Sequence, residues 1–364
     1  MEQPLRILFL TYSDEQGASA RYRVYQFLPY LRERGIEAEV RPLYGPRHYR
    51  LIMSKGSDAL QAAMMASAYL RRLRNILRAR RFDVVFFHRE AVPLGPVFME
   101  RLARRLGAGT ILDLDDLVFV NSPHVQSWLR RMLRNPGRIG DVVANVDCVC
   151  AANDHIADYA RSKNGCVEMI PGAEDMARYA VEPLRPLLDR FVIGWTGSFS
   201  TEPYLELLKP ALQRLALHIP NLTLLVIGGG AFSCPGVEVV HRKWSLDTEI
   251  PLVRGFNIGV MPLPDDEWSK GKCGGKGRIY MAAGVPSVVS AVGYNEQLIA
   301  DGETGMLVRT PDEWFGKILD LQRDPEKRAC IAAAGREHVR RHLSLEAMAP
   351  RLEELIRRVA RKAA

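Results

Sequence analysis

The fold is decided by the stretch Trp268-Ser-Lys-Gly-Lys-Cys-Gly-Gly-Lys-Gly-Arg-Ile-Tyr-Met-Ala-Ala-Gly-Val-Pro-Ser-Val-Val-Ser290, in which a loop, a helix and a strand follow one another. The loop is rich in glycine and lysine, and the pattern after it predicts a helix from Lys276 to Ala283. Gly284 is placed to end this helix, and Val285-Pro286 leads into an apolar strand. A short helix that returns at once to a buried strand is typical of a parallel α/β sheet.

Short apolar runs alternate with helix-length amphipathic segments along the whole chain, and this alternation occurs twice. The predicted strands of the first half are residues 7–10, 37–42, 83–88, 110–114, 148–152 and 167–170. Those of the second half are residues 191–195, 222–227, 237–240, 258–262, 286–290 and 305–308.

This pattern predicts an α/β protein with two doubly wound, Rossmann-like domains that face a cleft. Residues 176–190, which contain two prolines and no clear period, are interpreted as the linker. The first domain is expected to span residues 1–180 and the second residues 181–345, and a C-terminal helix at residues 346–364 is expected to close the structure.

Composition and charge limit the classes of protein and partner. The chain has 364 residues, 47% hydrophobic and 25% charged, which excludes a disordered or collagen-like protein. The net charge is +8, and residues 41–81 hold ten basic residues against the one acidic residue Asp58, so an anionic partner is expected to meet the first half. Nucleic acid is not expected, because the chain has neither a recognition-helix motif nor a basic surface interleaved with aromatic residues.

The cysteines and the N-terminus predict a location. No CxxC spacing occurs among the six cysteines, so buried thiols in a reducing compartment are expected: Cys148, Cys150, Cys166, Cys234, Cys273 and Cys330. The apolar run at residues 7–10 is too short for a signal sequence, and no run has the length of a membrane span. We therefore expect a cytoplasmic protein.

The glycine-rich loop is a candidate anion site. Four basic residues surround its glycines: Lys270, Lys272, Lys276 and Arg278. Backbone N–H groups of Gly274 and Gly275, the positive end of the helix dipole and the lysines together favour a diphosphate. The alternative is a mobile loop whose lysines are only solvated.

Several motifs of the second half resemble the C-terminal domain of the group 1 (family 4) retaining glycosyltransferases. They are Gly194-Trp-Thr-Gly-Ser198, Ile227-Gly-Gly-Gly230, Met281-Ala-Ala-Gly-Val-Pro-Ser-Val-Val-Ser290, Val292-Gly-Tyr-Asn-Glu296 and Asp301-Gly-Glu-Thr-Gly305. The resemblance implies the GT-B fold, with a nucleotide sugar held by the second domain and an acceptor by the first. It implies no cofactor beyond the donor substrate.

The chain departs from this family at two acidic positions and one basic pair. Gly271 and Ile279 stand where the family has two glutamates seven residues apart, and the basic pair after the first strand of the second domain is missing after Gly197-Ser198. We infer that the lysines of the glycine-rich loop neutralise the diphosphate instead. The residues expected to bind the donor are Gly17, Gly197, Ser198, Lys270, Lys272, Gly274, Gly275 and Lys276.

His88 is the candidate catalytic residue of the first half. It ends the strand at residues 83–88, where the resemblance places a histidine that contacts the donor sugar. The alternative is a histidine that caps backbone groups under a loop. The loop Gly17-Ala-Ser-Ala-Arg-Tyr-Arg23 suits contact with donor sugar or acceptor, and Arg21 and Arg23 are assigned to the acceptor side. Helix capping by Ser19, with solvated arginines, is the alternative for this loop.

Asp113-Leu-Asp-Asp116 ends another strand and is superficially similar to the Asp-x-Asp metal site of the other glycosyltransferase fold. Because a metal there would lie in the wrong domain for the diphosphate, we expect no metal site. We assign a structural or acceptor-side role to these aspartates, with Asp115 and Asp116 on the acceptor side.

A basic amphipathic helix is predicted within residues 60–81. Leu70, Leu73 and Leu77 follow one side of it, and arginines at similar spacing follow another. Peripheral contact with anionic lipid at the inner face of the membrane would bring the enzyme to a lipid-linked acceptor. An ordinary surface helix has the same pattern.

The function expected from these residues is metal-independent, retaining transfer of a hexose from a nucleotide diphosphate to a saccharide or lipid-linked saccharide, in cell-surface polysaccharide synthesis. The alternative is a non-catalytic subunit that binds a nucleotide sugar. Epimerisation is less favoured, because acid and base carboxylates are not evident.

Overall fold

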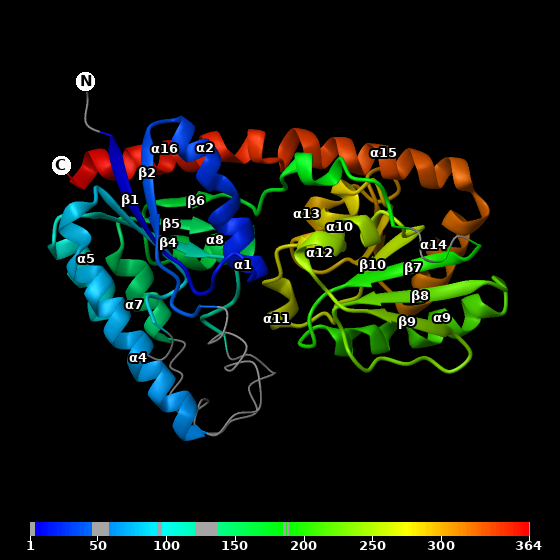
Figure 1. Cartoon of the computed structure of the whole chain (residues 1–364). Coiled ribbons are helices and arrows are strands. Elements are labelled where there is room, and N and C mark those ends of the chain that lie inside the picture. Colours follow the sequence, from blue (N-terminus) through cyan, green and yellow to red (C-terminus); the bar gives the residue numbers. More distant parts are fainter. Residues whose placement is uncertain are drawn as a thin grey trace. The chain divides into compact units, whose positions relative to one another are not determined.

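The computed structural model describes residues 4–45, 58–92, 97–120, 137–184, 187 and 189–363. These residues form two compact units (Figure 1). The first unit comprises Met1–Ala173 together with Leu345–Ala364, and the second comprises Glu174–Ser344.

The first unit is built on a parallel sheet in the order β2-β1-β3-β4-β5-β6. Its strands are β1 (Leu5–Leu10), β2 (Ile36–Val40), β3 (Val84–His88), β4 (Gly109–Leu114), β5 (Cys148–Ala151) and β6 (Val167–Met169). Every residue of the central strands β3 and β4 is buried, because helices cover both faces of the sheet.

Helices of the first unit form the two outer layers. They are α1 (Ala18–Arg23), α2 (Leu28–Glu33), α4 (Asp58–Leu77), α5 (Phe98–Arg105), α7 (Gly137–Asn145), α8 (Asp154–Arg161) and α16 (Leu345–Ala363), with short 3-10 turns at Tyr25–Phe27 and Ala79–Arg81. On one face α2 and α16 bury apolar side chains against β1, β3 and β4. α5 packs against β4 and α4 packs against α5, and α4 runs along the side away from α16 (Figure 1).

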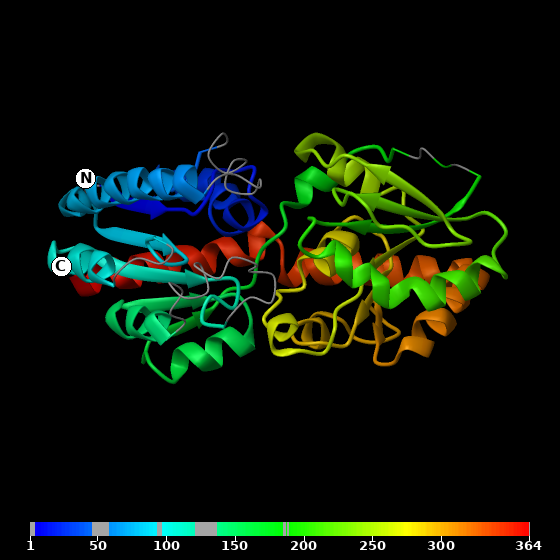
Figure 2. The same cartoon turned by 90° about the horizontal axis from the view of Figure 1, so that it is seen from below.

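The second unit has a parallel sheet in the order β12-β11-β10-β7-β8-β9. Its strands are β7 (Phe191–Thr196), β8 (Leu222–Ile227), β9 (Glu238–Arg242), β10 (Ile258–Met261), β11 (Ser287–Ser290) and β12 (Met306–Val308). Its helices are α9 (Lys209–Ala216), α10 (Leu246–Val253), α11 (Glu267–Lys270), α12 (Gly275–Ala282), α13 (Asn295–Leu298), α14 (Pro311–Arg323) and α15 (Pro325–His342), with 3-10 segments at Met176–Tyr179 and Glu202–Leu208. Figure 2 gives a second view of these layers.

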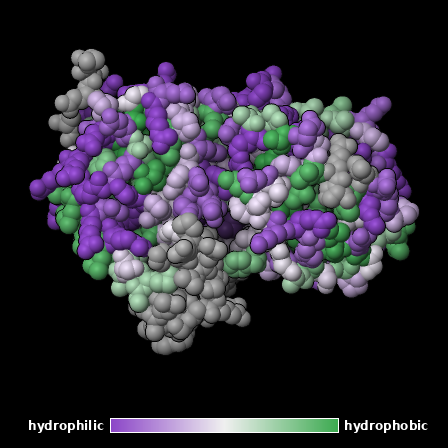
Figure 3. Space-filling view, viewed as in Figure 1, coloured by the Kyte–Doolittle hydropathy of each residue, from purple (hydrophilic) through white to green (hydrophobic). Residues whose placement is uncertain are grey.

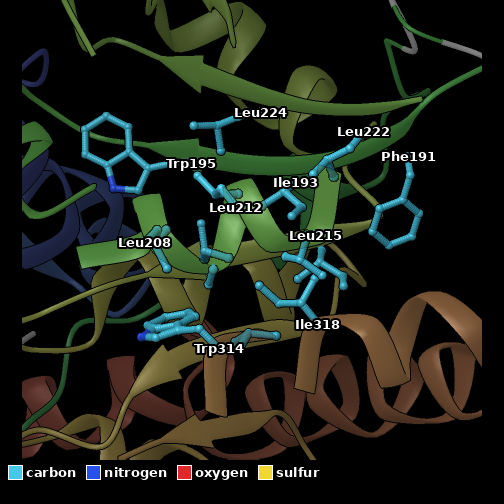
Figure 4. Close-up of a cluster of buried hydrophobic side chains, with 14 of the residues drawn as sticks. Phe191, Ile193, Trp195, Leu208, Leu212, Leu215, Leu222, Leu224, Trp314 and Ile318 are labelled. Carbon is cyan, nitrogen blue, oxygen red and sulfur yellow. The ribbon is translucent and has the colours of Figure 1, made fainter. Parts of the chain in front are cut away.

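One apolar cluster joins the second sheet to α9 and α14. Leu212 and Leu215 of α9 and Trp314 and Ile318 of α14 point toward Ile193 and its neighbours on the strands (Figure 4). This buried layer holds β7 in place, and with it the start of the loop that follows β7.

The twelve predicted strands are all confirmed, each within about two residues of its bounds. The segment after β1 forms α1, a 3-10 turn and α2 in succession, and Pro29 lies at the start of α2.

The division of the chain differs from the expected one. The first unit ends at Ala173 and the second begins at Glu174. Tyr179, which lies within the expected linker, is buried in the second unit. The C-terminal helix belongs to the first unit, because Leu352, Leu355 and Ile356 of α16 complete its core.

The expectation of six buried thiols was wrong. β5 and β6 pair with Val149 opposite Val167, so Cys148 and Cys166 lie opposite each other with a Cα–Cα distance of 4.7 Å, and they form a disulfide. Cys330 is exposed, whereas Cys150 and Cys234 are buried as expected.

Candidate active site

The topology defines one ligand edge in each unit. In a doubly wound sheet, ligands bind at the carboxyl ends of the strands, where the strand order reverses. This point lies between β7 and β10 in the second sheet and between β1 and β3 in the first. The predicted donor loops follow β7 and β10, and the predicted His88 ends β3.

The start of α12 exposes a cradle of backbone N–H groups. Gly274 has φ of +62° and precedes α12, which begins at Gly275, one residue earlier than predicted. A Cβ at Gly274 would lie 2.8 Å from the side chain of Leu298, so both the backbone angle and the space require glycine. No side chain caps the helix, and its first turn holds no acidic residue. This helix start therefore offers its N–H groups and its dipole to an anion.

Lys276 lies in the first turn of α12 and reaches the loop after β7. Its Nζ is 3.2 Å from Oγ1 of Thr201 and lies 5.4 Å from the centre of the Trp195 ring. Burial and the charge of Lys272 lower the pKa of Lys276 to about 8. Within the described residues no carboxylate forms an ion pair with Lys276, so an added anion would stabilise its charged form.

The other loop lysines differ in their surroundings. Lys272 places its Nζ 4.5 Å from the centre of the Trp268 ring. Lys270 is more exposed, and its Nζ lies 3.4 Å from a carboxylate oxygen of Asp265. The structure therefore brings Lys276 and Lys272 to the start of α12, whereas Lys270 already has a carboxylate partner.

Gly197 lets the loop after β7 pass close to Lys276. A Cβ there would lie 2.7 Å from Cε of Lys276 and 2.5 Å from the Trp195 ring. The loop after β8 packs against the loop after β7, because a Cβ at Gly228, where φ is +86°, would lie 2.4 Å from the Gly197 carbonyl oxygen. Ser198 is exposed and its Oγ lies 2.8 Å from Oγ of Ser200. The glycines thus let the loop after β7 pack closely against both Lys276 and the loop after β8.

Glu202 was missed by the sequence reasoning. One of its carboxylate oxygens accepts hydrogen bonds from the backbone N–H groups of Gly230, Ala231 and Phe232, at 2.9, 2.9 and 2.8 Å. Despite burial, these three donors lower the pKa of Glu202. The glycine loop after β8 is therefore an anion cradle filled by the protein's own carboxylate, which fixes the loop beside Gly197.

Arg278, one of the four basic residues around the glycine-rich loop, points into the second unit. Its guanidinium is buried and lies 2.7 Å from the buried carboxylate of Glu174, which also accepts from the hydroxyl of Tyr179 at 2.6 Å. Arg278 also donates to the carbonyl of Cys273 at 3.3 Å. On α12, Arg278 and Lys276 therefore have different tasks: the first supports the loop from inside and the second faces the ligand edge.

In the first unit, His88 is fully enclosed, with 1% of its surface exposed. Its Nδ1 accepts from the backbone N–H of Tyr12 at 3.4 Å, and its Nε2 lies 2.7 Å from Oγ of Ser19. Ser19 also donates to a carboxylate oxygen of Asp115. Ser19 therefore does not cap a helix, and His88 has both ring nitrogens in hydrogen bonds within the unit.

Arg89 follows β3 and contacts the same carboxylate. Its Nε donates to Asp115 at 2.8 Å, and its guanidinium lies 3.8 Å from Asp116. Although burial opposes ionisation, the Arg89 charge holds the pKa of Asp115 well below its usual range. Sequence reasoning had not singled out Arg89, and its place directly after His88 at the end of β3 was the available signal.

Arg23 and Asp113 lie in the interior of the first unit. Both are buried, and Nε of Arg23 donates to the Asp113 carboxylate at 3.1 Å while Nη1 donates to the carbonyl of Ile170 at 2.5 Å. The acceptor-side role predicted for Arg23 does not fit this burial, whereas the structural role expected for Asp113 does. Because Asp113 pairs with Arg23 and Asp115 with Arg89, these aspartates do not gather as a metal-ligand set in the described chain.

Arg21 and Gly17 lie at the start of α1. Arg21 is buried beside the ring of Tyr22, and its Nη1 donates to the carbonyl of Glu15 at 3.3 Å. Gly17 precedes α1, and a Cβ there would collide with the Ser13 side chain. Both residues thus shape the loop after β1, and their contact with a substrate stays a prediction.

The surface of α4 differs from an ordinary amphipathic helix. Its inner face consists of Met64, Ala68, Arg72 and Ile76, which are buried. Leu70 and Leu77 are instead 60% and 55% exposed, with Arg71 and Arg74 beside them on the exposed side. Hydrophilic and hydrophobic side chains lie next to each other over this helix, at the lower left of Figure 3. Leu70 and Leu77 of the predicted leucine stripe therefore face away from the core, whereas Leu73 is half-buried.

Two doubly wound parallel sheets, one in each unit, define the class of protein: the two-domain GT-B fold. Residues 190–324 match the family described as Glycosyl transferases group 1, and residues 8–171 match the family described as Glycosyl transferase 4-like domain. Together these matches show that the chain is a glycosyltransferase.

Similar proteins agree with this assignment. A GDP-mannose-dependent alpha-(1-6)-phosphatidylinositol monomannoside mannosyltransferase of Mycolicibacterium smegmatis is 26% identical over 356 residues, with 86% of each chain covered. Among solved structures, Anabaena HepE in complex with UDP and glucose has a TM-score of 0.66 at 17% identity, covering 97% of this chain and 99% of that one. A glycosyltransferase from Rickettsia africae has a TM-score of 0.69 at 14% identity, with 98% of both chains covered.

In the described part of the chain, no helix combines the length and the apolar composition that a membrane span needs.

Proposed function

We propose that this glycosyltransferase moves a hexose from a nucleotide-diphosphate donor to a saccharide or lipid-linked saccharide, with retention of configuration as in family 4, and with no metal ion or cofactor besides the donor. One observation carries the proposal: the uncapped start of α12 carries the partly buried Lys276, whose amine lacks a carboxylate partner among the described residues. An amine that burial drives toward neutrality is stabilised by a dianionic ligand.

The second unit supplies the electrostatic part of the reaction. Negative charge accumulates on the diphosphate as the glycosidic bond breaks, so groups aimed at that charge lower the barrier. The N–H groups of Gly274 and Gly275 and the ammonium of Lys276 are held in place before the donor binds, because Gly197 and Thr201 pack against the lysine. Lys272 adds a second positive charge at this edge. This arrangement takes the place of a divalent cation as the counter-charge.

The first unit supplies the acceptor side. The cluster of Ser19, His88, Arg89 and Asp115 lies at the reversal point of its sheet, which is where such sheets bind ligands. The exposed leucines and arginines of α4 fit the surface of an anionic bilayer, and the curated relative is named for a lipid substrate. We propose that α4 brings the enzyme to a lipid-linked acceptor at the cytoplasmic face of a membrane, within cell-surface polysaccharide synthesis.

A second function is favoured by one observation. Gly271 and Ile279 replace the two family glutamates, and Ile279 is buried in α12, so no carboxylate stands at that position of the site. A subunit that binds a nucleotide sugar without transferring it would tolerate this loss.

Calorimetry followed by a transfer assay separates the two functions. GDP, UDP, GDP-mannose and UDP-glucose are first titrated into the protein, and release of nucleoside diphosphate is then followed with and without a bacterial lipid extract. Binding together with acceptor-dependent release is the expected result. Binding with no release in any extract would favour the non-catalytic subunit, and absence of binding would overturn both.

A further inference from the structure

A hydrogen-bond chain of fixed direction runs through the ligand edge of the first unit. The backbone N–H of Tyr12 can only donate, so Nδ1 of His88 must carry a lone pair and the ring proton sits on Nε2. That proton points to Oγ of Ser19, 2.7 Å away, and the hydroxyl of Ser19 in turn donates a hydrogen bond to Asp115. Since a carboxylate can only accept, the direction of each hydrogen bond in the series is fixed at both ends. The ring of His88 accepts at Nδ1 and donates from Nε2.

Arg89 is held on the far side of the same carboxylate in an unfavourable backbone conformation. Within the described residues it is the one non-glycine with a left-handed backbone, with φ of +65°. Such a conformation persists only where several contacts enforce it, and it is common at functional sites. Here the backbone N–H of Arg89 donates to the carbonyl of Asp113 at 2.8 Å, and the side chain contacts Asp115 at 2.8 Å and Ser19 at 3.4 Å.

Glycine would suit this backbone better, so the side chain of Arg89 explains why the strain is retained. About a quarter of that side chain is exposed, at 23%. Its Nε and Nη2 are used in the contacts above, whereas Nη1 forms no hydrogen bond within the described part of the chain. The guanidinium therefore presents one donor edge outward, at the reversal point between β1 and β3.

The charges around Arg89 indicate the class of ligand. Two carboxylates lie beside the guanidinium of Arg89, Asp115 at 2.8 Å and Asp116 at 3.8 Å. Carboxylates this close to the outward edge repel an approaching phosphate, whereas neutral hydroxyl oxygens can accept from that edge without this repulsion. The site thus favours a neutral saccharide over an anionic group.

We propose that Arg89 is a substrate-binding residue of the first unit, which donates from Nη1 to a hydroxyl oxygen of a neutral acceptor saccharide. Asp115 is the residue that positions it, and His88 and Ser19 act through Asp115 without touching substrate. The proposal rests on the proposed transferase function. It places the sugar end of the acceptor, and not a phosphate, at the carboxyl end of β3.

The kinetic test compares Arg89→Lys and Asp115→Asn with the native chain, using the donor and the lipid extract that support transfer. Arg89→Lys keeps the charge but loses the planar fork, so kcat/KM for the acceptor is expected to fall roughly 10- to 100-fold. Asp115→Asn should cause a similar fall, and the double variant should lose less than the product of the two, because the residues act as one unit. The matched control is Arg105→Lys, an exposed arginine at the end of α5, which should stay within about twofold of the native chain.

Two readouts separate this role from a merely structural one. The donor KM and the calorimetric Kd for GDP and UDP should stay within about twofold in both variants, because the donor is held by the other unit. An equal loss in donor and acceptor parameters, or a full acceptor rate in Arg89→Lys, would overturn the substrate role of Arg89.

The network itself is tested without turnover. Nitrogen NMR of protein labelled with ¹⁵N-histidine, with the His88 signals assigned by their loss in His88→Gln, should show a neutral ring with the proton on Nε2. A proton on Nδ1 would overturn the directional chain, whatever the enzyme transfers. Absence of transfer by the native chain in every extract would instead overturn the proposed function, and with it the substrate role of Arg89.

Discussion

Lys276→Met should move ligand affinity and protein stability in opposite directions. Methionine keeps most of the packing against Trp195 but removes the ammonium. Burial lowers the pKa of Lys276 from 10.5 to about 8, so the folded protein binds fewer protons here than the unfolded chain. Below pH 8 this penalty is present in full, and it disappears as the pH rises toward 10.5. At pH 7 the variant without ligand should therefore be more stable by about 1–3 kcal/mol, the upper value being the full cost of the pKa change.

Affinity should change the other way. A charge-assisted hydrogen bond to phosphate contributes about 1.5–3 kcal/mol, so Lys276→Met should raise the Kd for GDP or UDP roughly 10- to 150-fold. Because the native site binds the diphosphate with a protonated amine, its Kd should also rise about tenfold for each pH unit above 8. That rise should be absent in Lys276→Met.

The assay is calorimetry at several pH values between 7 and 9.5, with urea unfolding of the same samples. Lys270→Met is the control, because Lys270 is more exposed and already lies beside Asp265. A Kd for Lys276→Met within twofold of the native value, or a native Kd that does not change with pH, would show that Lys276 does not meet the diphosphate.

Three further predictions follow from other parts of the chain. Glu202→Ala removes the acceptor of three backbone N–H groups and should lower the free energy of unfolding by about 2–4 kcal/mol at pH 7. Since the folded pKa of Glu202 is lowered, the stability difference between the native chain and the variant should shrink as the pH falls through that pKa. Urea unfolding at pH 7 and pH 3 checks both points. Equal stability of the two proteins at pH 7 would contradict the role given to Glu202. Donor consumption should survive excess EDTA, and a loss of rate that manganese or magnesium restores would end the metal-free assignment. Paired replacement of Leu70 and Leu77 by glutamate should abolish co-sedimentation with phosphatidylglycerol vesicles, whereas Leu217→Glu, at a residue 84% exposed in the second unit, should leave it unchanged.

The position of Arg72 explains which side of α4 faces the core. The structure turns Leu70 and Leu77 outward and buries Arg72, which donates to the carbonyls of Thr11, Arg41 and Ala91 at 2.8–2.9 Å. Burial lowers the pKa of Arg72 to about 9. Those carbonyls follow β1, β2 and β3, so a single guanidinium ties three strand-end loops together. The buried carbonyls at these strand ends need hydrogen-bond donors, and Arg72 supplies them. This requirement, rather than the pattern of leucines, decided which side of the helix faces the core.

The sequence by itself determined the twelve strands, the helix that follows the glycine-rich loop and the two-domain α/β class. Alternating apolar runs, glycine and proline determine local backbone structure over a few residues. Their effect on secondary structure can therefore be predicted without the rest of the chain. The resemblance to glycosyltransferases rested on the same short motifs and is confirmed by the family matches.

Only the tertiary structure decided which charged side chain meets which partner. Ser19 and His88 are 69 residues apart, and Arg278 and Glu174 are 104 apart, so no local pattern links them. Chain folding turned Arg278 inward and Lys276 toward the ligand edge on one short helix, enclosed His88 while leaving an edge of Arg89 exposed, and returned α16 to the first unit. The physical reason is that a buried charge must find its partner through space, and such partners become neighbours only when distant strands pair and bring their ends to one edge of a sheet.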